Sequence, residues 1–295
     1  MKKVKELNGF KLYTKKPNTI SKGALYTKEI FVNVNNEDKK RLIRVYLPSN
    51  YDFENPNKRF PVMYMMDGKN LFDDHTSFVG EWRVDETIEK YVKSNNKGMI
   101  VVGIDSSKSD MGRTNEMLPE SNYYVKDFPE FKEPLDGYGS ILGEYIFNEL
   151  KPMIDNTFYT LKDKANTGVG GSSMGGLYAF YLGAKYKDKV DFSLCFSPAF
   201  LLYTEKEFKQ EVENKISSNE GYGKFFLFCG GIDLEVIIEP LTLYMYKHLS
   251  SVGFDSKQVR YIYDTSATHY EGVWSIYFDT AIKHWGILEK QVDYE

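Results

Sequence analysis

The stretch Asn166-Thr-Gly-Val-Gly-Gly-Ser-Ser-Met-Gly-Gly176 decides the fold. Read as Gly-x-Ser-x-Gly, it is centred on Ser173, with Gly171 and Gly175 two residues to either side. This pattern is typical of a nucleophile elbow, a sharp strand-to-helix turn at which larger side chains in the glycine positions would collide. A short apolar run precedes the motif and a helical pattern follows it, as an elbow requires. The stretch therefore predicts a reactive Ser173 at the start of a helix.

Strand-like and helix-like segments alternate along the rest of the chain. Short apolar strands are expected over Phe60–Met66, Met99–Ile104, Thr167–Gly170, Phe192–Phe196, Phe225–Cys229 and Val259–Tyr263. Helices are expected over Glu81–Lys93, Leu142–Ile154, Gly176–Tyr186, Glu205–Ile216, Ile237–Val252 and Gly272–Ile287. Unbroken apolar strands are typical of parallel sheets that helices cover on both faces. Two earlier segments, Ala24–Val34 and Arg41–Leu47, alternate and predict an antiparallel pair. The fold class is α/β, with a mostly parallel central sheet flanked by helices.

The chain is expected to form a single domain over residues 1–295, since no linker rich in proline, glycine or serine divides it. Two long, mostly polar insertions, at about residues 105–137 and 197–224, follow predicted strands. Loops of this length are usually functional, and these two would emerge at the carboxyl edge of the sheet, where open α/β folds bind ligands. We expect them to form the substrate mouth.

The composition excludes several classes of function. The 295 residues include 38 basic and 42 acidic side chains, and this net charge of −4 argues against a nucleic-acid partner. No apolar run is long enough to cross a membrane. The N-terminus lacks the apolar core of a signal peptide, so a cytoplasmic location is expected, although a chain whose signal had been removed would look the same. Cys195 and Cys229 lie in apolar runs and are expected to be reduced.

A serine nucleophile needs a histidine base. Three histidines follow Ser173, and two of them, His248 and His284, lie within predicted helices. His269 lies instead in the loop after the last predicted strand, from which it could overhang the elbow. His269 is therefore the predicted base.

A carboxylate must orient that base. Asp233 and Glu235 both follow the strand Phe225–Cys229 closely enough to reach the next loop. We prefer Asp233, because Glu235 falls where a helix begins and would serve equally well as a first-turn charge. Asp255 and Asp264 are weaker candidates.

The loop after Phe60–Met66 is expected to complete an oxyanion hole, with the backbone N–H of Lys69 beside that of Met174. Gly68 would allow the sharp turn that this requires. Several acidic residues between 67 and 75 suggest an ion site, but their spacing matches no EF-hand or common zinc motif. We expect a solvated polar loop, no metal and no cofactor.

In combination, these motifs resemble the putative-esterase family of α/β-hydrolases, which includes esterase D, feruloyl esterases and enterochelin-type siderophore esterases. The resemblance rests on Pro61–Asp73, Gly80–Trp82, Gly171–Gly176, and His269 with Trp274 five residues on. It implies an α/β-hydrolase fold, and it implies Ser173, Asp233 and His269 as a catalytic triad. Many relatives have His-Gly where this chain has Asp67-Gly68. The resemblance therefore does not determine which side chains line the oxyanion hole.

The resemblance implies a serine ester hydrolase that works through an acyl-enzyme on a small-molecule substrate. Aromatic residues make up 16% of the chain, and rings near the mouth suit an aryl acyl group or a sugar face. A feruloyl, cinnamoyl or acetyl ester of a plant-derived oligosaccharide is favoured. A siderophore trilactone esterase, an acyltransferase with the same triad and a non-catalytic binding protein are the alternatives, and a homodimer is compatible with the sequence. The expected substrate-binding residues are Asn70, Phe72, Trp82, Arg113, Tyr123, Tyr124, Tyr270 and Trp274.

Overall fold

A computed structural model describes residues 3–108, 111–119, 137–202 and 215–289. Within this part of the chain, the strands form one ten-stranded sheet in the order β1-β2-β3-β4-β6-β5-β7-β8-β9-β10. The strands from β6 onward in this order are parallel, and β1 to β4 pair antiparallel with one another and with β6. The chain therefore has an α/β-hydrolase fold with antiparallel N-terminal strands, as the sequence predicted.

The strands are β1 (Glu6–Leu7), β2 (Phe10–Leu12), β3 (Ala24–Val34), β4 (Glu37–Leu47), β5 (Val62–Met66), β6 (Ile100–Ile104), β7 (Thr167–Ser172), β8 (Phe192–Phe196), β9 (Lys224–Gly230) and β10 (Val259–Asp264). The α-helices are α1 (Val84–Asn95), α2 (Gly112–Met117), α3 (Gly139–Tyr145), α4 (Lys151–Thr157), α5 (Met174–Lys185), α7 (Glu235–Ser251) and α8 (Glu271–His284). A π-helical turn, Ile146–Leu150, joins α3 to α4.

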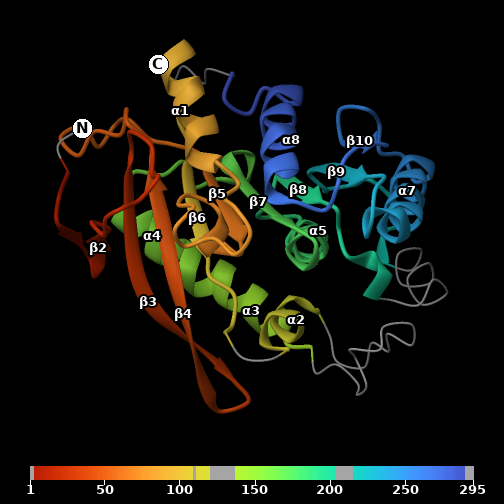
Figure 1. Ribbon diagram of the computed structural model, residues 1–295, viewed down its shortest axis with the longest axis horizontal. Coiled ribbons are helices and arrows are strands. Elements are labelled where there is room, and N and C mark those ends of the chain that lie inside the picture. The colour runs from red at the N-terminus through yellow and green to blue at the C-terminus, as the bar shows by residue number, and fades with distance from the viewer. Residues whose placement is uncertain (1–2, 109–110, 120–136, 203–214, 290–295) are drawn as a thin grey trace.

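Helices cover both faces of the sheet, and the parallel strands send successive side chains into two separate cores. Along β5, Val62, Tyr64 and Met66 pack on the side of α3, α5 and α7. Met63 and Met65 pack on the opposite side with residues of α1 and α8, which lie together in Figure 1. All five side chains are buried, and this explains why the strand is an unbroken apolar run.

The expected helices are confirmed where the structure describes them, with boundaries shifted by up to three residues. The helix expected over Leu142–Ile154 is the composite of α3, the π-turn and α4, and α7 begins at Glu235, two residues before the expected start. The helix expected over Glu205–Ile216 lies almost entirely outside the described residues. The same holds for most of the insertion at 105–137, of which α2 is the described helical part. Among the described helices, none is long and apolar enough to cross a membrane.

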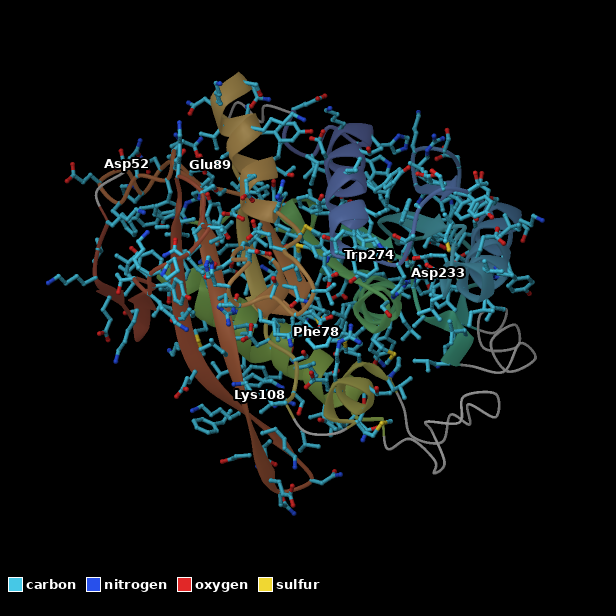
Figure 2. The ribbon with its side chains drawn as sticks, in the orientation of Figure 1. Asp52, Phe78, Glu89, Lys108, Asp233 and Trp274 are labelled. Atoms are coloured by element: carbon cyan, nitrogen blue, oxygen red, sulfur yellow. The ribbon has the colours of Figure 1, made fainter. Side chains whose placement is uncertain are left out.

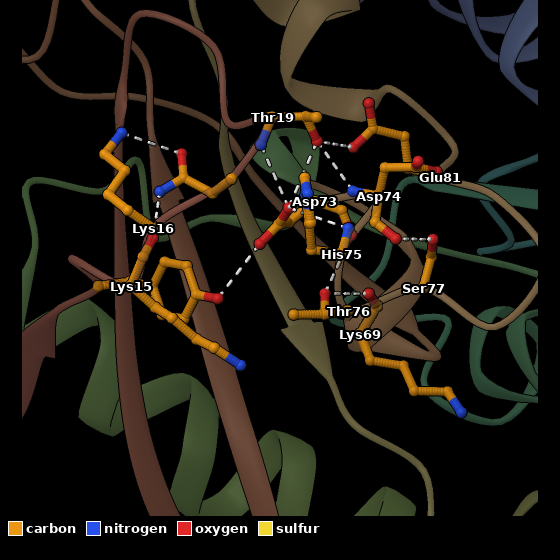
Figure 3. A network of polar contacts seen from close by, with 12 residues as sticks. Lys15, Lys16, Thr19, Lys69, Asp73, Asp74, His75, Thr76, Ser77 and Glu81 are labelled. Atoms are coloured by element: carbon orange, nitrogen blue, oxygen red, sulfur yellow. Dashed lines mark hydrogen bonds and ion pairs between the residues drawn. The ribbon is translucent and has the colours of Figure 1, made fainter.

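Hydrogen bonds fasten the N-terminal segment to the loop that follows β5 (Figure 3). Asp73 is almost fully buried and accepts hydrogen bonds from the Tyr13 hydroxyl at 3.2 Å and from the Thr19 N–H at 3.2 Å. The Thr19 hydroxyl also donates to Glu81 at 2.8 Å. The N-terminal segment therefore holds this loop at two points, Asp73 and Glu81.

Candidate active site

Ser173 lies at the sharp turn between β7 and α5. Its backbone has φ 57° and ψ −120°, a conformation that a residue with a side chain rarely adopts. Hydrogen bonds hold it there: its N–H donates to the Phe196 carbonyl at 2.9 Å, and its carbonyl accepts from Leu177 at 3.0 Å. A Cβ atom on Gly171 would lie 2.5 Å from the Gly175 carbonyl oxygen. The turn therefore requires glycine there, as the elbow motif predicts.

The turn after β5 lies against the start of α5. Asp67 has a left-handed backbone (φ 55°, ψ 48°) and leads into a short 3-10 turn, Gly68–Asn70, that contains Lys69. A Cβ atom on Gly175 would lie 2.9 Å from the Cβ of Met66, so the two turns are in direct contact. The first N–H groups of a helix have no partner within that helix, and Met174 is the first residue of α5. The expected donors Lys69 and Met174 therefore lie on adjoining turns.

The carboxylate beside His269 is Glu235, and the preference for Asp233 is wrong. The Nδ1 atom of His269 lies 2.9 Å from Oε1 of Glu235, whose side chain is fully buried. Asp233 is exposed at the turn that precedes α7, far from the N-terminal strands in Figure 2. Its backbone is left-handed (φ 58°). The chain thus turns at Asp233 and only then begins the helix that directs Glu235 inward.

The periodicity of α7 contains the signal that identifies Glu235. The buried residues of this helix are Glu235, Ile238, Thr242, Met245 and Leu249, at alternating spacings of three and four. Such spacing places them on one helix face. Glu235 is therefore the first residue of the buried stripe, and a carboxylate in such a stripe calls for buried partners.

Donors surround the Glu235 carboxylate. Its Oε2 atom accepts hydrogen bonds from the Gly230 N–H at 3.0 Å and from the Cys229 thiol at 3.0 Å. Burial alone would raise the pKa of the Glu235 carboxyl, but hydrogen bonds from His269, Cys229 and Ser197 outweigh burial and hold the pKa below its usual value. Glu235 is therefore ionised at neutral pH. Cys195 and Cys229 are both free buried thiols, as expected.

Two further polar contacts lie next to the turn after β5. Asp67 pairs with Arg113 of α2 through two hydrogen bonds of 2.8 and 2.7 Å. Burial would raise the pKa of Asp67, but Arg113 outweighs it and keeps the pKa low. Asn70 donates to Glu271, at the start of α8, over 3.2 Å. Burial, with a further contribution from the negative charge of Asp67, raises the pKa of Glu271. Sequence reasoning singled out neither carboxylate for these roles.

The expected substrate-binding residues fall into different environments. Phe72, Trp82 and Trp274 are buried, with exposures of 1%, 2% and 4%, so the expectation that these rings line the mouth is wrong. Phe72 stacks on Tyr46, and Trp82 packs against Phe196 and Trp274. Phe72 and Trp82 belong to the core because the loop after β5 folds back over the sheet, and Trp274 of α8 packs into the same core.

The remaining expected contacts lie nearer the surface. Tyr270 is 41% exposed. Its hydroxyl lies close to Gly80, where an added Cβ atom would be 3.1 Å from it. Arg113 is about one third exposed, at 36%. Phe78, which we did not anticipate, is 80% exposed and lies under the Lys69 ammonium group. Tyr123 and Tyr124 lie outside the described residues.

Comparison with known proteins decides the family. A family described as "Putative esterase" matches residues 35–220, which is more than half of the chain. The chain belongs to this esterase family. The matched region of the esterase holds the elbow and the turn after β5, whereas Glu235 and His269 follow it along the chain.

Solved structures share the esterase's fold at low sequence identity. A ferulic acid esterase is 18% identical with a TM-score of 0.63, and the match covers 90% of this chain and 99% of that one. A siderophore hydrolase, EstA from Aspergillus nidulans, is 16% identical with a TM-score of 0.68 and coverages of 90% and 95%. The enterobactin esterase of Shigella flexneri is 15% identical with a TM-score of 0.64, and the match covers 88% of this chain and 59% of that longer one.

Proposed function

We propose that this esterase is a serine carboxylic-ester hydrolase that works through an acyl-enzyme. The observation that carries the proposal is the contact of 2.9 Å between His269 and the buried Glu235, after β10 and β9, together with Ser173 on its strained turn at the end of β7. The carboxyl ends of neighbouring parallel strands meet at one edge of a sheet, where ligands bind in open α/β folds.

The proposed mechanism uses the chain's own groups. The Glu235 carboxylate accepts a hydrogen bond from Nδ1–H of His269, so that Nε2 is left as the base. His269 takes the hydroxyl proton as Ser173 Oγ bonds to the ester carbonyl carbon, and the N–H groups of Met174 and Lys69 stabilise the oxyanion. His269 returns the proton to the leaving alcohol as the ester C–O bond breaks. Water then attacks the acyl-enzyme by the same proton route, releasing the acid and Ser173.

A neutral ester, with a feruloyl, cinnamoyl or acetyl group, is the proposed substrate class. The site's charges support it: Arg113 is already paired with Asp67, and Glu271 adds a further carboxylate nearby. A polyanionic siderophore trilactone would need cationic side chains that are not already paired with a carboxylate of the protein. The exposed rings of Phe78 and Tyr270 suit an aryl group. Names of similar structures include both ferulic acid and siderophore esterases, so similarity favours neither.

The decisive test is Ser173→Ala, with the neighbouring Ser172→Ala as a matched control. We expect Ser173→Ala to lower hydrolysis of an activated acetyl ester by roughly 10⁴-fold or more and to abolish labelling by a fluorophosphonate. Ser172→Ala should keep both ester hydrolysis and fluorophosphonate labelling, since Ser172 is the buried last residue of β7. Hydrolysis by Ser173→Ala at the wild-type rate would overturn the proposal.

Turnover of three substrates tests the proposed substrate class. Feruloyl, acetyl and trilactone esters are compared by kcat/KM, and the highest value for the trilactone would contradict the proposed substrate class. An acyltransferase would instead deliver the acyl group to added alcohol in preference to water, which product analysis detects. A non-catalytic protein would show neither turnover nor fluorophosphonate labelling.

A further inference from the structure

One short segment at the end of β8, Phe196–Ala199, contacts Ser173, the proposed nucleophile. The Phe196 carbonyl accepts the Ser173 N–H at 2.9 Å, and the Ala199 N–H donates to the Ser173 carbonyl at 3.0 Å. Ser197, which lies between these two contacts, is fully buried. A buried hydroxyl requires hydrogen-bond partners, and the partners of Ser197 identify its role.

The Ser197 hydroxyl has one partner that fixes the direction of its hydrogen bonds. The Nε1 atom of Trp274 lies 2.9 Å from Ser197 Oγ. An indole N–H only donates, so the Ser197 oxygen accepts this bond and its own proton is free for another acceptor. Ser197 also helps to lower the pKa of the nearby Glu235 carboxyl.

The backbone fixes Ser197 in this position. Its φ of 45° lies in the left-handed region, and its N–H donates to the Phe228 carbonyl at 2.7 Å. A non-glycine residue keeps such a conformation only where its surroundings enforce it. The hydroxyl is therefore held in place, and Trp274 is placed relative to it.

Trp274 also contacts His269, the proposed base. Its ring meets the His269 imidazole edge to face, with 4.9 Å between centroids and 87° between planes. His269 is thus held at Nδ1 by Glu235 and across its ring by Trp274, and Trp274 is in turn hydrogen-bonded to Ser197. We propose that Ser197 is a positioning residue that holds the Trp274 indole and thereby fixes the ring plane of His269. This inference rests on the proposed function.

The experiment compares Ser197→Ala, Trp274→Phe and the double variant, with rates expressed per site labelled by fluorophosphonate. Ser197→Ala should lower kcat about tenfold, equivalent to about 1.4 kcal/mol of barrier, and leave KM unchanged because Ser197 does not face the mouth. The far-downfield proton resonance of His269 Nδ1–H should shift or broaden. Trp274→Phe keeps a ring against His269 but removes the N–H that Ser197 accepts, so kcat should fall by a similar factor.

The double variant separates the effect of Ser197 on the orientation of His269 from its effect on the stability of the protein. Ser197→Ala leaves the indole N–H of Trp274 buried without an acceptor, which costs stability, and adding Trp274→Phe removes that N–H. We therefore expect the double variant to regain melting temperature without regaining kcat. Wild-type kcat and an unshifted Nδ1–H resonance in the double variant would overturn the inference.

Two more variants keep the test decisive. Cys229→Ala removes a thiol donor from the Glu235 carboxylate and leaves the Trp274 indole in place, so a larger loss of kcat there than in Ser197→Ala would contradict the special role of Ser197. If Ser197→Ala gives no folded protein, Ser197→Cys retains a weak acceptor for the indole N–H and should give an intermediate kcat; wild-type kcat in this variant would count against the inference. Failure of the proposed function itself would show separately, as wild-type turnover by Ser173→Ala.

Discussion

The Nδ1 atom of His269 lies 2.9 Å from Oε1 of Glu235, and these two residues are 34 positions apart in the sequence. Glu235 begins α7 after β9, and His269 lies in the loop between β10 and α8. Strands β9 and β10 are parallel neighbours in the sheet, so the loops at their carboxyl ends adjoin. The carbonyl of Ala267 joins the two loops by accepting from Gly231 and Ile232, each at 3.1 Å.

Glu235→Gln tests which carboxylate orients the base. We expect kcat/KM to fall by roughly 10³–10⁴-fold, because the amide can donate to His269 and favour the wrong tautomer. Asp233→Asn, only two positions away but exposed, is the matched control and should retain near wild-type kcat/KM. The reverse ranking of the two variants would restore Asp233 as the acid.

The ionisation of Glu235 gives a pH-dependent contribution to stability. Its pKa in the folded protein is lowered, so the folded state binds this proton less tightly than the unfolded chain, in which the pKa is about 4.3. The contribution is complete above the unfolded pKa and is lost as the pH falls through the folded one. The difference in melting temperature between wild type and Glu235→Gln should therefore be larger at about pH 7 than at about pH 3. A difference that grows on acidification would contradict this.

Gly171→Ala should destabilise the elbow. The new Cβ would lie 2.5 Å from the backbone oxygen of Gly175, and backbone atoms there cannot move without displacing Ser173. We expect a loss of about 1–3 kcal/mol in the free energy of unfolding, measured in urea, and reduced activity. At Gly143 the nearest neighbour of a Cβ is the Tyr186 hydroxyl at 3.0 Å, a side-chain atom that can shift. Gly143→Ala should therefore cost less, and equal losses would argue against strain at the elbow.

The Asp67–Arg113 pair should show strong coupling. Arg113→Gln leaves a buried carboxylate without its cation next to the turn after β5, whereas Asp67→Asn with Arg113→Gln leaves two neutral amides. We expect the double variant to be more stable than the sum of the single losses predicts, with a coupling energy of about 0.5–3 kcal/mol from a double-mutant cycle. Additive losses would show that the two side chains contribute independently of one another.

Local pattern in the sequence determined the elbow, the strand-helix alternation and the choice of His269. These features depend on short-range rules: a turn that excludes side chains near Ser173, and the unbroken apolar runs of strands covered on both faces. The same rules could not choose between Asp233 and Glu235 as the carboxylate that orients His269. Both lie at a strand-to-helix junction, and the choice depends on the residue at which the helix begins. Reading the three- and four-residue spacing of α7 back to its start would have favoured Glu235.

Only the tertiary structure decided which side chains face the site. The left-handed turn at Asp233 directs that residue to solvent, and the bonds to Ala267 that fix this turn come from a loop more than thirty positions away. Long-range packing likewise buries Phe72 and Trp82, and it joins Ser197 to Trp274 across 77 positions. Composition and periodicity specify which elements form, whereas contacts between distant elements fix the direction of each side chain, and the chemistry of the site depends on those directions.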